Sequence, residues 1–208
     1  MPDASLERIG PTLDVYSDYV CPFSRLVWPV VQHVRMTTPV RLRLRAFELR
    51  PVPAPFADDG YVHALWMHAQ PIADRLAIPI AFPAVRTRTR KAHEAVAYAR
   101  TQGRGEEMHE AVLRAGIEAS QDIGRIDVLV RIGTEVGLDP AGLKVALDID
   151  RFTDEVLDDC ARAAELGIRA VPAFVLQGAT GEDAIRTGWQ EAESLLSWLR
   201  ANLMAERK

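Results

Sequence analysis

The sequence predicts an α/β fold that carries a large all-helical insertion. Two strand-like segments, residues 12–17 and 40–49, precede a long stretch of helical composition, and a hairpin-like segment at 173–189 follows it. Alternating apolar and polar residues mark the strands, whereas apolar residues three and four positions apart mark the helices. With 208 residues and a hydrophobic content of 48%, the chain can bury a sizeable core.

The first strand and the first helix follow each other closely. The segment TLDVYS, residues 12–17, alternates and contains valine and tyrosine, which predicts a short buried strand. A helix is predicted from Pro22, because proline suits a first helical turn. The valines that follow recur at helical spacing: Val27, Val30, Val31 and Val34. Pro29 lies inside this helix and predicts a kink there.

The second strand, within VRLRLRAFEL at 40–49, has one apolar and one charged face. Arg41, Arg43 and Arg45 alternate with apolar residues. Charged alternate positions are typical of an edge strand, where they discourage pairing with another chain. We therefore interpret the arginines as edge protection and not as an anion site.

The remaining chain divides into an insertion and a closing unit. Residues 61–147 are helical in composition, with proline and glycine punctuation that favours several short helices. A helix at 151–166 ends at Gly167, and an amphipathic helix closes the chain. These boundaries predict a discontinuous domain of residues 11–58 and 151–208, and an insertion domain of residues 59–150.

Charge and hydropathy exclude several classes of protein. The net charge of −4 argues against a general nucleic-acid binder, and the basic patch of Arg86, Arg88, Arg90 and Lys91 is interpreted as solvated surface. The sequence contains neither a membrane span nor a secretory leader, so we expect a cytoplasmic protein. The histidines lack metal-ligand spacing, so no metal site is predicted.

The chain has two cysteines, Cys21 and Cys160, which the expected cytosolic setting predicts to be separate thiols. Cys160 falls on an apparent helical stripe and is interpreted as a small core residue; the stripe comprises Val156, Leu157, Ala161 and Ala164. Cys21 instead stands at a helix start, where unbonded N–H groups and the helix dipole favour the thiolate. We therefore predict that Cys21 is the reactive thiol, with a buried structural cysteine as the alternative.

Ser24 occupies the position one helical turn after Cys21. A second cysteine there could close a disulfide with the first, but a hydroxyl cannot. It can instead donate a hydrogen bond to a neighbouring thiolate. The sequence therefore predicts a site with a single thiol.

These features meet a third motif, GIRAVPAFVL, in which Pro172 follows Val171. The order of elements, the C-P-F-S motif and the V-P-A-F motif resemble DsbA-like, specifically FrnE-like, thioredoxin-fold oxidoreductases. The resemblance covers about Thr12 to Leu203, and three further matches support it: FELRP at 47–51, RKAHEA at 90–95 and EVGLD at 135–139. It implies a thioredoxin-like fold with the helical insertion.

The resemblance also assigns roles to residues. It makes Cys21 the attacking thiol, Ser24 its neighbour, and Pro172 a cis-proline beside it. The substrate-binding residues it suggests are Val171, Pro22, Phe23 and Trp189, of which Trp189 is equally well explained as a core residue. Two polar residues are candidates to tune the thiol: Asp18, which precedes the cysteine loop, and His93, which lies in the insertion that faces the active site in relatives. A structural role explains His93 better.

The leading functional hypothesis is a monothiol thiol–disulfide oxidoreductase that uses glutathione or a protein or peptide thiol. Release of the captured substrate would then need an outside thiol. No permanently bound cofactor is expected. One alternative is a glutathione-dependent enzyme resembling 2-hydroxychromene-2-carboxylate isomerase or kappa-class glutathione transferase, although such relatives usually have serine in place of Cys21. The other is a redox-silent binding protein. Whether the protein forms a homodimer stays open.

Overall fold

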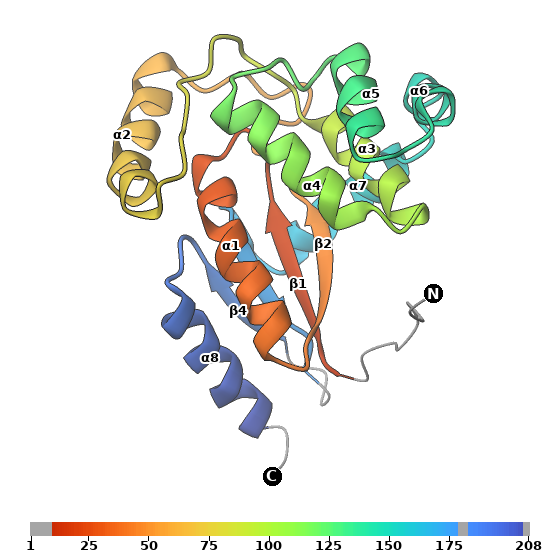
Figure 1. The fold of residues 1–208 in the computed structure, drawn as a ribbon. Helices are drawn as coiled ribbons and strands as arrows, with labels where there is room; N and C mark the ends of the chain where they lie inside the picture. Colours follow the sequence, from red (N-terminus) through yellow and green to blue (C-terminus); the bar gives the residue numbers. More distant parts are fainter. Residues whose placement is uncertain (1–9, 179–182, 206–208) are drawn as a thin grey trace.

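The computed structural model describes residues 10–178 and 183–205 (Figure 1). Its single sheet has four strands in the order β2-β1-β3-β4. The strands are β1 (Thr12–Ser17), β2 (Arg41–Ala46), β3 (Ala173–Leu176) and β4 (Ala184–Thr187). β1 pairs with β2 in parallel, and the other two pairings are antiparallel. This is the thioredoxin-like sheet that the resemblance implies.

The helices fall on both faces and at one end of this sheet (Figure 1). Their bounds are α1 (Pro22–Thr37), α2 (Asp59–Leu76), α3 (Arg90–Thr101), α4 (Gly105–Leu113), η1 (Arg114–Glu118), α5 (Ile126–Glu135), α6 (Pro140–Asp148), α7 (Thr153–Glu165) and α8 (Ala192–Ala205). Figure 1 shows α1 and α8 on one face, α7 on the other, and the α2–α6 segment across the end where β1 and β2 terminate. The predicted helical insertion is therefore present.

The largest core cluster crosses the boundary between sheet and insertion. It joins Val15 of β1 and Val31 of α1 to Leu113 of α4 and Leu143 of α6, all fully or almost fully buried. The four valines that predicted α1 are all buried, and Pro29 lies exposed on a helix that continues to Thr37. The division into residues 11–58 with 151–208 and residues 59–150 stays a prediction, because this core is shared.

Strand β2 lies at an edge of the sheet, as its charged face predicts. The Arg43 guanidinium donates to both oxygens of the buried Asp14, at 2.5 and 2.9 Å. Arg45 donates to Asp159 of α7 at 2.6 Å, and the other Asp159 oxygen accepts from the Ala46 amide at 2.9 Å. The edge is therefore held by paired charges and by a side chain that caps one of its amides.

Two predictions about surface and core are wrong in detail. The buried stripe of α7 consists of Val156, Asp159 and Ala163, so Cys160 is only half-buried, and Leu157, Ala161 and Ala164 are exposed. The sequence misplaces the stripe because small and apolar residues lie on more than one face of this helix, and packing against β2 selects the face that is buried.

The basic patch is solvated only at Arg86, whereas Arg88, Arg90 and Lys91 are half-buried. Arg90 pairs with Glu48 at 2.5 Å, and Lys91 pairs with Glu94 at 2.9 Å. Arg88 donates to the carbonyl oxygens of Arg50 and Ala54 at 2.5 and 2.8 Å. Apart from Glu94, which lies three positions after Lys91 in α3, these partners come from other segments of the chain, which a local charge pattern does not reveal.

Candidate active site

A tight turn places Cys21 at the first turn of α1. The Cys21 amide donates to the Asp18 carbonyl at 3.1 Å, and Pro22 is the first helical residue. Cys21 itself is the N-cap, in an extended conformation. Its sulfur also meets another segment of the chain.

That segment is the loop before β3. The Cys21 Sγ lies 3.4 Å from the Val171 carbonyl oxygen, to which the thiol can donate. The Val171–Pro172 peptide bond is cis. The Gly188 amide donates to the Pro172 carbonyl at 2.7 Å, which ties the T-G-W segment to this loop. Residues separated by 150 positions in the sequence thus form one site.

The environment of the thiol differs from the ionised state expected at a helix start. Cys21 is 2% exposed and packs in a cluster with Val171, Ile168 and Ala163. Burial raises the pKa of the Cys21 thiol to about 11, and hydrogen bonds from Ser24 and from the Phe23 amide oppose that rise. The sequence predicts the helix start correctly, but packing from distant segments removes water from the sulfur.

Ser24 is a structural partner of the thiol loop. Its side chain is almost fully buried, and its hydroxyl oxygen accepts from the Asp18 amide at 3.3 Å. Both its amide and its hydroxyl lower the pKa of Cys21 by hydrogen bonding. Ser24 therefore lies where a second thiol would lie and supports the first one.

Asp18 and His93, the two suggested polar residues, meet beneath the loop. The Asp18 Oδ1 lies 3.7 Å from the His93 Nε2, and both side chains are at least 96% buried, with exposures of 0% and 4%. The second Asp18 oxygen accepts from the Leu49 amide at 2.6 Å. The negative charge of Asp18 also helps to raise the pKa of Cys21. The structure thus connects the insertion helix α3 to the thiol through Asp18.

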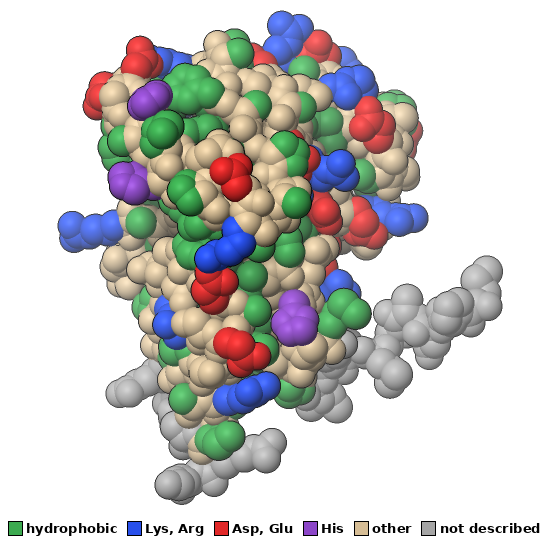
Figure 2. Space-filling view, turned by 60° about the vertical axis from the view of Figure 1, so that its left-hand side comes forward, with side chains coloured by type: hydrophobic (Ala, Val, Ile, Leu, Met, Phe, Trp, Pro, Cys, Tyr) green, Lys and Arg blue, Asp and Glu red, His purple; other side chains and the backbone are tan. Residues whose placement is uncertain are grey.

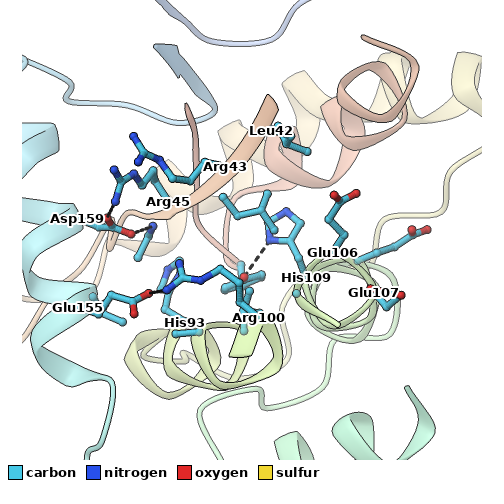
Figure 3. A pocket seen from close by; sticks show the side chains of 18 of the residues that line it. Leu42, Arg43, Arg45, His93, Arg100, Glu106, Glu107, His109, Glu155 and Asp159 are labelled. Atoms are coloured by element: carbon cyan, nitrogen blue, oxygen red, sulfur yellow. Dashed lines mark hydrogen bonds and ion pairs between the residues drawn. The ribbon is translucent and has the colours of Figure 1, made fainter. Parts of the chain in front are cut away.

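A polar cavity of about 530 Å³ lies behind this pair, between β2 and helices α3, α4 and α7 (Figure 3). His93 and His109 line it, and the Tyr19 hydroxyl bonds the His109 Nδ1 at 2.9 Å. Burial, with the charge of His93, lowers the pKa of His109 to about 3. Figure 3 shows that its rim carries ion pairs, including Arg100 with Glu155 and Arg45 with Asp159.

The other predicted site residues do not all gather at the thiol. Pro22 is buried, and the half-buried Phe23 packs both against the cluster of Cys21 and against the cluster of Leu26. Trp189 packs against the Leu26 cluster and the main core, outside the cluster that contains Cys21. The suggested role of Trp189 in binding substrate therefore has no contact with that cluster to support it.

Arg25 is a positive charge close to Cys21 in the sequence, and it donates to Glu118 of η1 at 2.6 Å, which neutralises its charge. Sequence reasoning missed the Tyr19–His109 pair, because its partners are 90 positions apart. The described cysteines are both free thiols, and the Cys160 Sγ lies 3.9 Å from the Ala46 carbonyl oxygen.

Comparison with known proteins agrees with this geometry. Residues 12–197 match the family of DSBA-like thioredoxin domains. The chain is 35% identical over 183 residues to the protein YwbO of Bacillus subtilis (strain 168), covering 82% of this chain and 92% of that one.

Solved structures share the fold. The cytosolic disulfide reductase DsbM of Pseudomonas aeruginosa has a TM-score of 0.74 at 20% identity, covering 93% of this chain and 99% of its own. A structure of that reductase with GSH has a TM-score of 0.71 at 20% identity, with the same coverage. A 2-hydroxychromene-2-carboxylate isomerase has a TM-score of 0.74 at 18% identity, covering 94% of this chain and 96% of its own. On the family match and the identity to YwbO, the chain belongs to the DSBA-like thioredoxin domain family.

Proposed function

We propose that the protein is a monothiol thiol–disulfide oxidoreductase that forms mixed disulfides at Cys21. One observation carries the proposal: the Cys21 Sγ lies 3.4 Å from the Val171 carbonyl, beside Pro172, while the hydroxyl of Ser24 replaces a second thiol. Glutathione is the proposed co-substrate, and the neighbour DsbM with GSH supports that choice. We further propose that the protein acts in the cytoplasm, as DsbM does by its description.

The proposed reaction has two exchange steps. The Cys21 thiol loses its proton, and its thiolate attacks one sulfur of a disulfide RSSR. The S–S bond of the substrate breaks, RS⁻ leaves and takes up a proton, and Cys21–S–S–R forms. A second thiol, such as glutathione, then attacks the R sulfur, which gives a new disulfide and returns Cys21 to the thiol.

An outside thiol is needed because the described site supplies no second sulfur. Ser24 cannot form a disulfide, and the Cys160 sulfur lies against Ala46 of β2. Since Cys21 is buried, access also requires that a half-exposed neighbour such as Phe23 move aside when a substrate binds.

A redox-silent binding protein is the second candidate. The burial of Cys21 and its pKa of about 11 favour that reading, since little thiolate is present at neutral pH. The isomerase alternative gains no separate support, because 18% identity to 2-hydroxychromene-2-carboxylate isomerase shows the fold alone.

Intact-mass spectrometry after incubation with oxidised glutathione tests the proposal. In a Cys160→Ser background we expect one glutathione on the native protein and none after Cys21→Ser. Adding Ser24→Cys should remove the adduct, because a thiol one helical turn away can attack the mixed disulfide and release glutathione. If Cys21 stays unmodified in the native protein but reacts once it is unfolded, the redox-silent reading is correct.

A further inference from the structure

A second cavity, of about 130 Å³, opens beside the loop that carries the thiol. Val20, the residue before Cys21, lines it. Leu49 lines it too and also packs against the cluster that contains Cys21. The cavity therefore does not include Cys21, but Val20 and Leu49 connect its walls to the surroundings of the thiol.

The walls of this cavity are aromatic and unusually exposed. Tyr61, Phe82 and Val85 are 53%, 50% and 44% exposed, and Phe56 and Trp66 also line the cavity. Figure 2 shows hydrophobic side chains gathered on this side of the molecule, around α2 at the upper left. Contiguous patches of exposed apolar side chains often mark binding sites, whereas single exposed apolar residues are ordinary.

Contacts from other segments hold these walls in place. The Arg88 guanidinium stacks 4.0 Å from the Phe56 ring centroid while it binds the carbonyls of Arg50 and Ala54. The Trp66 indole donates to the Ala81 carbonyl at 3.0 Å, so its polar atom is satisfied. A wall fixed before binding loses little entropy when a ligand enters.

A π-helical turn forms one side of the cavity. Gly116 and Ile117 of η1 line it, and a Cβ added at Gly116 would approach the Tyr19 carbonyl oxygen to 3.0 Å. The Ile117 carbonyl accepts from the Ala81 amide at 2.7 Å, which joins this turn to the opposite wall. Such π-turns often occur at functional sites.

Among the charged side chains of the lining, one cation has no carboxylate partner within the described residues. The side chains of Thr87, Ser120 and Gln121 have hydrogen-bond partners within the protein. Of the charged lining groups, Arg86 and Asp59 pair with each other. Arg50 bonds only the Leu49 carbonyl, at 3.0 Å, and among the described residues no carboxylate pairs with it. Its half-buried guanidinium lies 5.7 Å from the Tyr61 ring centroid.

We propose that this cavity binds a small molecule consisting of one aromatic ring and a carboxylate. The volume accommodates about one six-membered ring. The ring packs among Phe56, Tyr61 and Trp66, and the carboxylate accepts from Arg50, whose planar guanidinium suits that geometry. No other lining cation lacks a carboxylate partner in the described chain.

The position next to Val20 gives the site a role in the reaction. If the proposed thiol chemistry holds, the cavity receives the non-sulfur part of a small aromatic disulfide or thiol while its sulfur reaches Cys21. This role rests on the proposed function, whereas the binding of the ring and carboxylate does not.

An NMR titration of the Cys21→Ser protein tests binding without any thiol reaction. Benzoate, its neutral counterpart benzamide, and acetate are added separately while the Trp66 indole N–H signal is followed. We expect saturable shifts with benzoate, affinity at least about tenfold weaker for benzamide, because it lacks the charge, and no comparable binding of acetate. Arg50→Gln should abolish the preference for benzoate, and Tyr61→Ala should weaken both aromatic ligands.

Two exposed sites away from the cavity provide matched controls. Arg162→Gln on α7 and Ile185→Ala on β4 should leave both affinities unchanged. The proposal is overturned if benzoate binds no better than benzamide, or if Arg50→Gln binds benzoate as tightly as the parent protein. Failure of glutathione to modify Cys21 would overturn only the thiol chemistry and would leave this result standing.

Discussion

At the scale of single residues, the environment of Cys21 combines opposing effects on one sulfur. Burial raises its pKa to about 11, while the amide and hydroxyl of Ser24 lower it. The Val171 carbonyl, 3.4 Å away, accepts from the neutral thiol and so favours the protonated form. We expect a thiol held this way to react slowly at neutral pH.

Ser24→Ala removes the hydroxyl that favours the thiolate, so we expect the pKa of Cys21 to rise further. At pH 8 the rate of alkylation by iodoacetamide should fall about three- to tenfold, because one hydrogen bond is worth roughly 1 kcal/mol and less thiolate is present. The rate is measured against pH in a Cys160→Ser background. Ser24→Thr keeps the hydroxyl and serves as the control. An unchanged rate for Ser24→Ala would mean that the hydroxyl does not act on the sulfur.

At the scale of elements, strand β2 depends on a partner from another part of the chain. Asp159 of α7 accepts from both the Arg45 guanidinium and the Ala46 amide, at 2.6 and 2.9 Å. Helix α7 thereby covers the carboxyl end of β2, at Ala46. This end of the strand also lines the polar cavity. The same contact explains why a polar residue occupies the buried stripe of α7.

Asp159→Ala should lower the free energy of unfolding by about 2–3 kcal/mol, since it leaves the buried Ala46 amide unpaired and leaves the Arg45 guanidinium with only the Asp14 carboxylate, 3.5 Å away. The neighbouring Asp158 is exposed, so Asp158→Ala is the matched control and should change stability by less than about 0.5 kcal/mol. Urea unfolding followed by circular dichroism measures both. Equal effects of the two substitutions would show that the α7–β2 contact contributes little.

At the scale of the whole molecule, the insertion and the sheet share one core and one set of buried polar groups. Tyr19, which follows β1, bonds His109 of α4, and His93 of α3 lies beside both Tyr19 and Asp18. Within the described residues, no helix is long and apolar enough to cross a membrane. Because the buried side chains of Tyr19, His109, His93 and Asp18 join the insertion to the sheet, the stability of the fold depends on keeping these groups neutral or paired.

His109 makes this dependence measurable in acid. Burial lowers its pKa from 6.5 to about 3, so between these values the unfolded chain binds a proton that the folded chain does not. The resulting stability is present above pH 6.5 and is lost as the pH falls toward 3, by up to about 5 kcal/mol. His109→Gln should flatten this part of the curve of unfolding free energy against pH. His33→Gln, at an exposed position on α1, should not. A Gln variant with the parental slope would assign the acid sensitivity to other groups.

Much of the fold could be predicted because the spacing of apolar residues along the sequence indicates the strands and helices locally. The strand at 12–17 and the start of α1 at Pro22 match the structure, and the charged alternation of β2 correctly indicates an edge strand. The hairpin of β3 and β4 also follows from local signals. Cys160 shows the limit of this reasoning, since a helix can carry apolar residues on more than one face, and only its packing partner selects the face that is buried.

The sequence by itself determined which atoms are available for chemistry: a single thiol at a helix start, with a hydroxyl one turn later. Only the tertiary structure decided the state of that thiol, because the groups that dehydrate and contact it, Val171 and Ile168, come from about 150 residues away. Ionisation depends on the solvation and charges surrounding an atom in space, and those are set by packing. For the same reason, the aromatic cavity and the unpaired Arg50 became visible only when distant loops were brought together.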